Sequence, residues 1–111
     1  MKVMNRDVVN FVNNASGILE KKIPMKLYNA IDLNMKSLMT AAETYMKQYG
    51  KCLKKESEEE AGKAVEELLS IEVDAVIQTV PDSVLARVDE SDKYDALTGR
   101  EYQAIRFMIS K

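Results

Sequence analysis

The sequence contains no histidine and only one cysteine, Cys52. Without histidine, the chain cannot use histidine-based catalytic triads, histidine general bases or histidine-ligated zinc. A single cysteine can form neither an internal disulfide nor a thiolate metal cluster. This sparing use of cysteine is typical of a reduced, intracellular protein, and we therefore expect a cytoplasmic location.

Glycine is also scarce, and neither GxGxxG nor GxxxxGK[ST] occurs, which excludes the common phosphate-binding loops. No apolar run approaches the roughly 20 residues that a membrane span needs. The first residues lack the apolar core and cleavage site of a signal peptide. Acidic residues are plentiful, so carboxylate catalysis and Mg²⁺ binding stay open. We nevertheless expect no enzyme, no catalytic or cofactor-binding residue, no metal ligand and no membrane partner.

The composition is that of a globular domain. With 111 residues, 46% of them hydrophobic and 31% charged, the chain predicts one domain over residues 1–111. The net charge is −2, but residues 1–55 hold ten Lys/Arg and four Asp/Glu, whereas residues 56–111 hold six and fourteen. Either one half meets a charged partner, or the two halves fold against each other and neutralise.

Two amphipathic patterns open the chain. The first predicts a helix over residues 6–20, with Asn5 as its N-cap. Its apolar stripe consists of Val8, Phe11, Val12, Ala15, Ile18 and Leu19. Pro24 then breaks the chain and suits the first position of a new helix.

A heptad seam predicts that this second helix is long, spanning residues 24–55. The seam consists of Tyr28, Ile31, Met35, Leu38, Ala42, Tyr45, Tyr49 and Cys52, at alternating spacings of three and four. Such a helix would be about 48 Å long, whereas a compact domain of this size is about 35 Å across. The helix must therefore bend near Gly50, project, or pair with another copy. We expect a homo-oligomer, most simply a dimer.

The charge changes sign after this helix. Lys51, Lys54 and Lys55 suit a helix C-terminus, and Ser57 is a plausible N-cap for the next helix. Two acids would satisfy the positive end of the helix dipole. The excess predicts a contact surface for a basic partner, formed by Glu56, Glu58, Glu59 and Glu60.

The remaining residues predict one strand and two helices. A helix runs to about Ser70, and alternating apolar residues predict a strand over 71–79. Its partner would be a return strand near residues 85–88 or the same strand of a second copy. Thr98 and Glu101 form a capping box that opens a helix over 99–109. The predicted class is therefore α+β and mostly helical, with four helices, the second long and coiled-coil-like, and one or two short strands.

Three segments carry a family resemblance. Residues 21–51 read KKIPMKLYNAIDLNMKSLMTAAETYMKQYGK, residues 65–80 read VEELLSIEVDAVIQTV, and residues 97–109 read LTGREYQAIRFMI. They resemble the Pro-x-Lys and Ala-Ile-x-x-Asn opening, the Leu-Leu-x-x-Glu-Val strand and the closing Phe-Met-Ile helix of a family of small bacteriophage proteins of unknown function. The family has no agreed catalytic residues, so the resemblance transfers no site.

The resemblance implies a protein that acts by binding in the cytoplasm of a bacterial host. The expected function is inhibition of a host defence protein, with a basic bacterial protein as the partner. Two alternatives stay open: a sponge that sequesters a nucleotide messenger of host defence, and an accessory factor in phage assembly.

Other ligands have weaker sequence signals. Tyr28, Tyr45 and Tyr49 could stack on a nucleotide, but tyrosines along a seam are more often core or interface residues. The lysines of the long helix could contact nucleic acid, but the net charge is negative and no nucleic-acid-reading motif occurs, so we do not expect nucleic acid as a partner. Arg100 could hold an anion at a helix start, where Thr98 and Glu101 already use the free amides.

Overall fold

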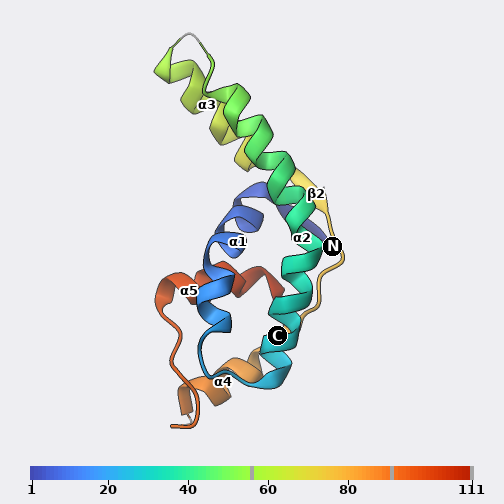
Figure 1. Cartoon of the computed structure of the whole chain (residues 1–111), viewed down its shortest axis with the longest axis vertical. Helices are drawn as coiled ribbons and strands as arrows, with labels where there is room; N and C mark the ends of the chain where they lie inside the picture. The colour runs from blue at the N-terminus through green and yellow to red at the C-terminus, as the bar shows by residue number, and fades with distance from the viewer. Residues whose placement is uncertain (56, 91, 111) are drawn as a thin grey trace.

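The computed structural model describes residues 1–55, 57–90 and 92–110. They form a base of packed helices from which a helical hairpin projects (Figure 1). The molecule measures 52 × 24 × 23 Å, and its radius of gyration is 15.7 Å. A compact chain of this length would have a radius of gyration near 13 Å. The extra length comes from the hairpin.

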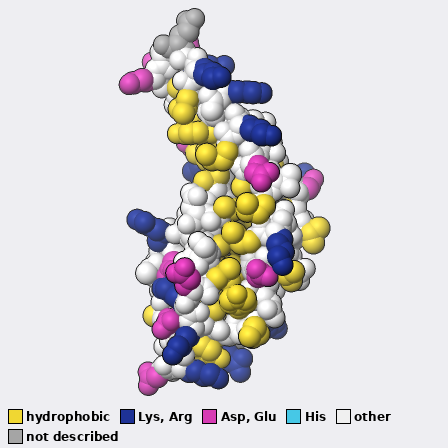
Figure 2. Space-filling model, in the orientation of Figure 1, with side chains coloured by type: hydrophobic (Ala, Val, Ile, Leu, Met, Phe, Trp, Pro, Cys, Tyr) yellow, Lys and Arg dark blue, Asp and Glu magenta, His cyan; other side chains and the backbone are white. Residues whose placement is uncertain are grey.

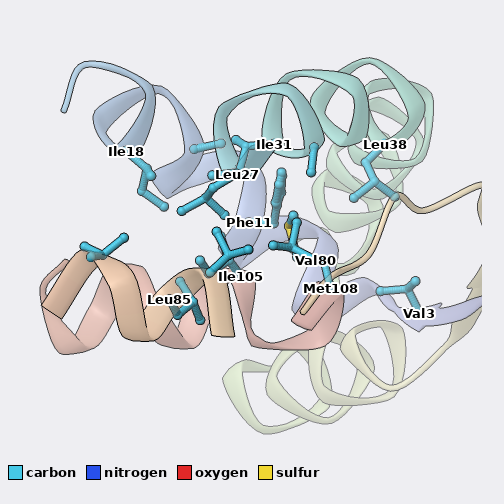
Figure 3. Close-up of a cluster of buried hydrophobic side chains, with 14 of the residues drawn as sticks. Val3, Phe11, Ile18, Leu27, Ile31, Leu38, Val80, Leu85, Ile105 and Met108 are labelled. Carbon is cyan, nitrogen blue, oxygen red and sulfur yellow. The ribbon is translucent and has the colours of Figure 1, made fainter. Parts of the chain in front are cut away.

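The base is built around α1 (Asn5–Leu19). This helix packs against the first half of α2 (Met25–Cys52) and against α5 (Gly99–Ile105), and α4 (Asp82–Glu90) adds its buried face to the same core. Their buried apolar side chains point toward one another (Figure 3). Labelled examples are Phe11 and Ile18 of α1, Leu27, Ile31 and Leu38 of α2, Leu85 of α4 and Ile105 of α5. Each buried side chain of this kind stabilises the fold by roughly 1.5–3 kcal/mol relative to an exposed one.

The first helix lies one residue from its predicted bounds, but the predicted N-cap is wrong. Met4 occupies the N-cap position, and no side chain caps the helix. Asn5 is buried instead, and its Nδ2 donates a hydrogen bond to the Leu68 carbonyl at 2.9 Å. Its backbone N–H donates to the Ile71 carbonyl at 2.9 Å. This contact with a distant segment takes the side chain away from the capping position.

The long helix is confirmed. It runs unbroken through Gly50, and its 28 residues span about 42 Å. Pro24 is its N-cap, and the helix ends at Cys52, three residues earlier than predicted. The helix does not end at Gly50, and its second half projects from the base, which is one of the predicted routes (Figure 1). Its second half lies beside α3 (Glu58–Leu69) in the hairpin (Figure 1).

The predicted strand is shorter than expected, and its partner was not foreseen. β2 covers Glu72–Asp74 and pairs antiparallel with β1, Lys2–Met4, so that Val3 faces Val73. The predicted return strand is wrong, because residues 85–88 lie in α4. Val84, Leu85 and Val88 are buried together at helical spacing, which favours a helix over a strand.

The last predicted helix begins as expected and ends early. Thr98 and Glu101 form the predicted capping box. After Ile105 the chain tightens into a 3₁₀ turn, η1 (Arg106–Met108), and β4 (Ile109–Ser110) then pairs parallel with β3 (Val80–Pro81). The mostly helical class with a few short strands is confirmed. The described residues form five α-helices rather than the predicted four, because α4 was read as a strand.

Candidate functional site

The projecting hairpin is the most distinctive surface of the molecule. We call it the finger and define it as residues 39–52 of α2 together with α3, residues 58–69. Tyr45 and Leu68 are the buried side chains inside it. Tyr45 also stacks on Tyr49, with ring centroids 5.9 Å apart. The finger therefore has a thin core of its own, and most of its remaining surface faces solvent.

The tip of the finger carries the predicted change of charge. Ser57 caps α3, and its Oγ accepts a hydrogen bond from the Glu60 N–H at 3.1 Å. Glu58, Glu59 and Glu60 form the first turn and are all exposed. Glu56 lies outside the described residues. The predicted helix joint is therefore confirmed.

The tip acids are only partly neutralised by the chain itself. Glu59 pairs with Lys63 at 3.5 Å, one turn further along α3. Within the described residues, Glu58 and Glu60 make no salt bridge with the lysines that end α2. Figure 2 shows the basic and acidic side chains gathered on opposite sides of this end. The acids therefore remain available to an external cation.

The seam residues of α2 are mostly covered by their own chain. Ile31 and Leu38 are fully buried in the base, and Tyr45 is buried in the finger. Met35, Ala42, Tyr49 and Cys52 are half-buried, and only Tyr28 is exposed, at 39%. Contacts within one chain account for this heptad seam. The homo-oligomer therefore stays a prediction. The fully buried seam residues are not accessible to a second copy.

The three seam tyrosines do not form one stacking platform. Tyr28 lies about 25 Å along the helix from Tyr45, given 1.5 Å per residue. Burial raises the pKa of the Tyr45 hydroxyl, and the neighbouring Tyr49 and Cys52 raise it further. Tyr45 is thus a neutral, buried side chain that braces the finger rather than an accessible surface for a nucleotide.

Two depressions on the finger offer little to an anionic ligand. One, of about 470 Å³, is an open hollow along α3 lined by Lys63, Glu66, Glu67, Ser70 and Ile71. Another, of about 280 Å³, lies between the two finger helices and includes Lys51, Lys55 and Glu67. A phosphate would meet carboxylates in both. Among the described residues, no group of three or more acidic or cysteine side chains could hold a metal ion.

Two polar contacts in the base were not predicted. Asn34 is fully buried; its Nδ2 donates to the Gln78 carbonyl at 2.9 Å, and its Oδ1 accepts from the Gln78 N–H at 2.7 Å. This pair fixes the segment between β2 and β3 against α2. Asn34 is the Asn of the Ala-Ile-x-x-Asn motif, so the motif itself was the available signal. The geometry gives Asn34 a structural role.

The second contact joins the loop after α1 to α5 and to the residues that precede it. Lys21 Nζ donates to Glu101 Oε1 and to the Ala96 carbonyl, and Lys22 N–H donates to Asp95 Oδ2 at 2.8 Å. The hydrogen bond from Lys21 holds the pKa of Glu101 below its usual range, and the bond from the Thr98 N–H adds to this effect. Glu101 already closes the capping box, so the anion pocket considered for Arg100 is filled by the chain itself.

Comparisons with known proteins leave the function open. No family model, curated protein or solved structure matches this chain. The resemblance to small bacteriophage proteins therefore stays a prediction. In the described part of the chain, no helix has both the length and the apolar character needed to cross a membrane.

Proposed function

We propose that this chain is a non-enzymatic binding protein whose finger holds a basic surface of a bacterial protein. The role that fits best is a phage-encoded inhibitor of a host defence protein, acting in the host cytoplasm. The observation that supports this proposal is the finger tip, where Glu58 and Glu60 are exposed and carry no salt bridge within the described residues.

Charge and shape together favour a protein as the partner. Acids in excess of the local need of a helix start raise the negative potential, which steers a basic partner and speeds association. The hairpin projects from the base, so its end is open to the approach of a large partner such as a protein (Figure 1).

The two other candidate functions have less support. A nucleotide messenger needs cations around its phosphates, and both finger depressions contain glutamates. An assembly factor would also bind protein, so the identity of the partner decides between it and a defence inhibitor. A sponge would gain thermal stability on addition of cyclic or linear nucleotides, whereas a protein binder would gain none.

The test is affinity capture from a bacterial lysate, followed by kinetics with the captured partner. The triple variant Glu58→Gln, Glu59→Gln, Glu60→Gln keeps the shape of the tip and removes its charge. We expect its association rate to fall by about tenfold or more at low salt, with a weaker salt dependence. The matched control replaces the exposed Glu20, Glu72 and Glu90 by Gln and should associate as the wild type does. Equal rates and equal salt slopes for both triples would reject the acidic tip as the contact surface.

A further inference from the structure

An apolar stripe runs along the solvent side of α2 and shares Tyr28, Met35, Ala42 and Tyr49 with the edge of the seam. We call it the outer stripe: Tyr28, Met35, Met39, Ala42, Met46, Tyr49 and Leu53. Tyr28 and Met35 are seven residues apart, and the spacings between the residues that follow are four, three, four, three and four. At about 100° per residue these positions fall within an arc of about 80° on the helix. Figure 2 shows apolar side chains following the length of α2 on one face.

The chain covers the outer stripe only in part. Met35, Ala42 and Tyr49 are half-buried, whereas Tyr28 is 39% exposed, Met39 41%, Met46 60% and Leu53 57%. The stripe repeats every seven residues, as in a coiled-coil contact between two helices, and flexible methionines adapt easily to such a surface. The residue seven positions before Met39 is Asp32, which is charged, so the apolar row of Met39, Met46 and Leu53 does not continue toward the base. A second helix of about the length of α2 would cover the whole stripe.

We infer that the outer stripe is the contact of an antiparallel pair of α2 helices from two copies of this chain. In the register that brings the stripes together, Met39 lies against the partner's Ala42 and Met46 against the partner's Met35. Leu53 then lies against the partner's Tyr28. The contact is the same patch on both copies, as a two-fold dimer requires.

Charge complementarity identifies the second copy as the occupant. Lys36 and Glu43 lie one position outside the stripe, on its solvent edge. Antiparallel helices bring equivalent edge positions together, so in this register Lys36 meets the partner's Glu43 and Glu43 meets the partner's Lys36. Lys36 already contacts Asp32 at 3.4 Å, whereas Glu43 has no salt bridge within the described residues.

A parallel arrangement does not use these charges. If the two helices ran parallel and in register, Lys36 and Glu43 of one copy would face Leu38 and Tyr45 of the other copy. Leu38 and Tyr45 are buried within each chain, so the charges would find no charged partner there. The antiparallel arrangement directs the two fingers to opposite ends and leaves both acidic tips exposed. The dimer therefore does not depend on the proposed function and is compatible with it.

The test is sedimentation velocity of the full chain over a micromolar dilution series at low ionic strength. We expect the wild type to dimerise reversibly. Lys36→Glu and Glu43→Lys should each weaken the dimer by about tenfold, because both symmetric pairs become repulsive. The double variant with both changes should restore association to nearly the wild-type level. Met46→Glu should abolish it, since a charge would be buried in the contact.

The matched control is Glu90→Lys, which makes the same charge change on α4 and should leave association unchanged. Circular dichroism of each variant confirms that the exposed substitutions leave the fold intact. A wild type that stays monomeric at high micromolar concentration overturns the inference. A double variant that associates no better than the two single variants overturns the antiparallel register. Neither result bears on the acidic-tip test, which measures binding to a different protein.

Discussion

Asn34 and Gln78 join the segment between β2 and β3 to the longest helix. Ala75, at the start of this segment, exchanges backbone hydrogen bonds with Met1. The residues after Ala75 have no regular partner strand, so their backbone groups need hydrogen bonds from elsewhere. Asn34 supplies one acceptor and one donor from a fully buried position. A carboxamide offers both kinds of group in one planar side chain, which a hydroxyl or carboxylate does not match.

Replacing Asn34 by leucine should therefore destabilise the protein. The Gln78 backbone would lose two part-buried hydrogen bonds to the Asn34 side chain, each worth about 0.5–1.5 kcal/mol. We expect the free energy of unfolding to fall by about 1–3 kcal/mol in urea titrations. Asn29→Leu, at an exposed position of the same helix, is the control and should change it little. Similar urea midpoints for the two variants would contradict the pairing role.

The Lys21–Glu101 pair predicts a specific pH dependence. The pKa of Glu101 is lowered in the folded state, chiefly by the hydrogen bond from Lys21. The folded state therefore favours the ionised carboxylate, and this stability is complete above the unfolded-state pKa. It is lost as the pH falls from the ordinary glutamate range down through the folded-state pKa.

The measurement is the free energy of unfolding of the wild type and of Glu101→Gln across this acidic range. The wild type should be more stable at neutral pH, and the difference between the two should shrink as the pH falls. Because the pair is mostly shielded from water, with side-chain exposures of 25% and 13%, added salt should reduce the difference only partly. A difference that does not vary with pH would rule out the charge of Glu101 as its source.

At the scale of elements, the helices followed from the sequence better than the strands did. Apolar stripes located α1, α2 and α3 because each helix buries one face, and the stripe records that face directly. The capping residues Ser57 and Thr98 were also visible, because a cap acts on amides two or three residues away. Local signals of this kind need no knowledge of the tertiary fold.

β1 was missed and α4 was misread because both elements are short. β1 is three residues long and pairs with residues some 70 positions later, so no local pattern identifies it. α4 places Val84, Leu85 and Val88 on its buried face, but the helix has only nine residues, so two turns give a weak periodicity. In the candidate site, the charges of the tip were predictable, whereas the cover that α3 gives to the seam was not.

The two side-chain helix caps should behave differently when removed. Thr98 starts a helix in the base, where α1 packs against α5, whereas Ser57 starts the outer helix of the finger. Removing either cap costs about 0.5–2 kcal/mol locally. We expect Thr98→Ala to lower the global stability, and Ser57→Ala mainly to speed hydrogen exchange in α3, because thinly packed elements open locally.

Amide exchange followed residue by residue measures this difference. Ser37→Ala, at an exposed position in the middle of α2, is the control and should leave both exchange and stability nearly unchanged. Protection in α1 and α5 should be unaffected by Ser57→Ala. A uniform loss of protection over the whole chain in that variant would show that the finger and the base unfold together.

At the scale of the whole molecule, the uneven charge is partly resolved by folding. Arg6 pairs with Glu66 and Lys21 with Glu101, so in both cases a cation of the first half meets an anion of the second. The prediction that the halves neutralise each other is confirmed for these contacts. The tip of the finger is the exception. Its lysines and glutamates are neighbours in the sequence, but within the described residues no salt bridge links the lysines at the end of α2 to the glutamates at the start of α3.

The pairing of β1 with β2 also sets an order of events during synthesis. Synthesis runs from the N-terminus, so Val3 is made before α1, and Val73 only after both finger helices have been made. Throughout that interval the edge of β1 lacks its partner, while α1 and α2, which are neighbours in sequence, are free to pack. The short sheet is therefore a late closure. It joins the first residues of the chain to the base of the finger once α3 has returned the chain to that point.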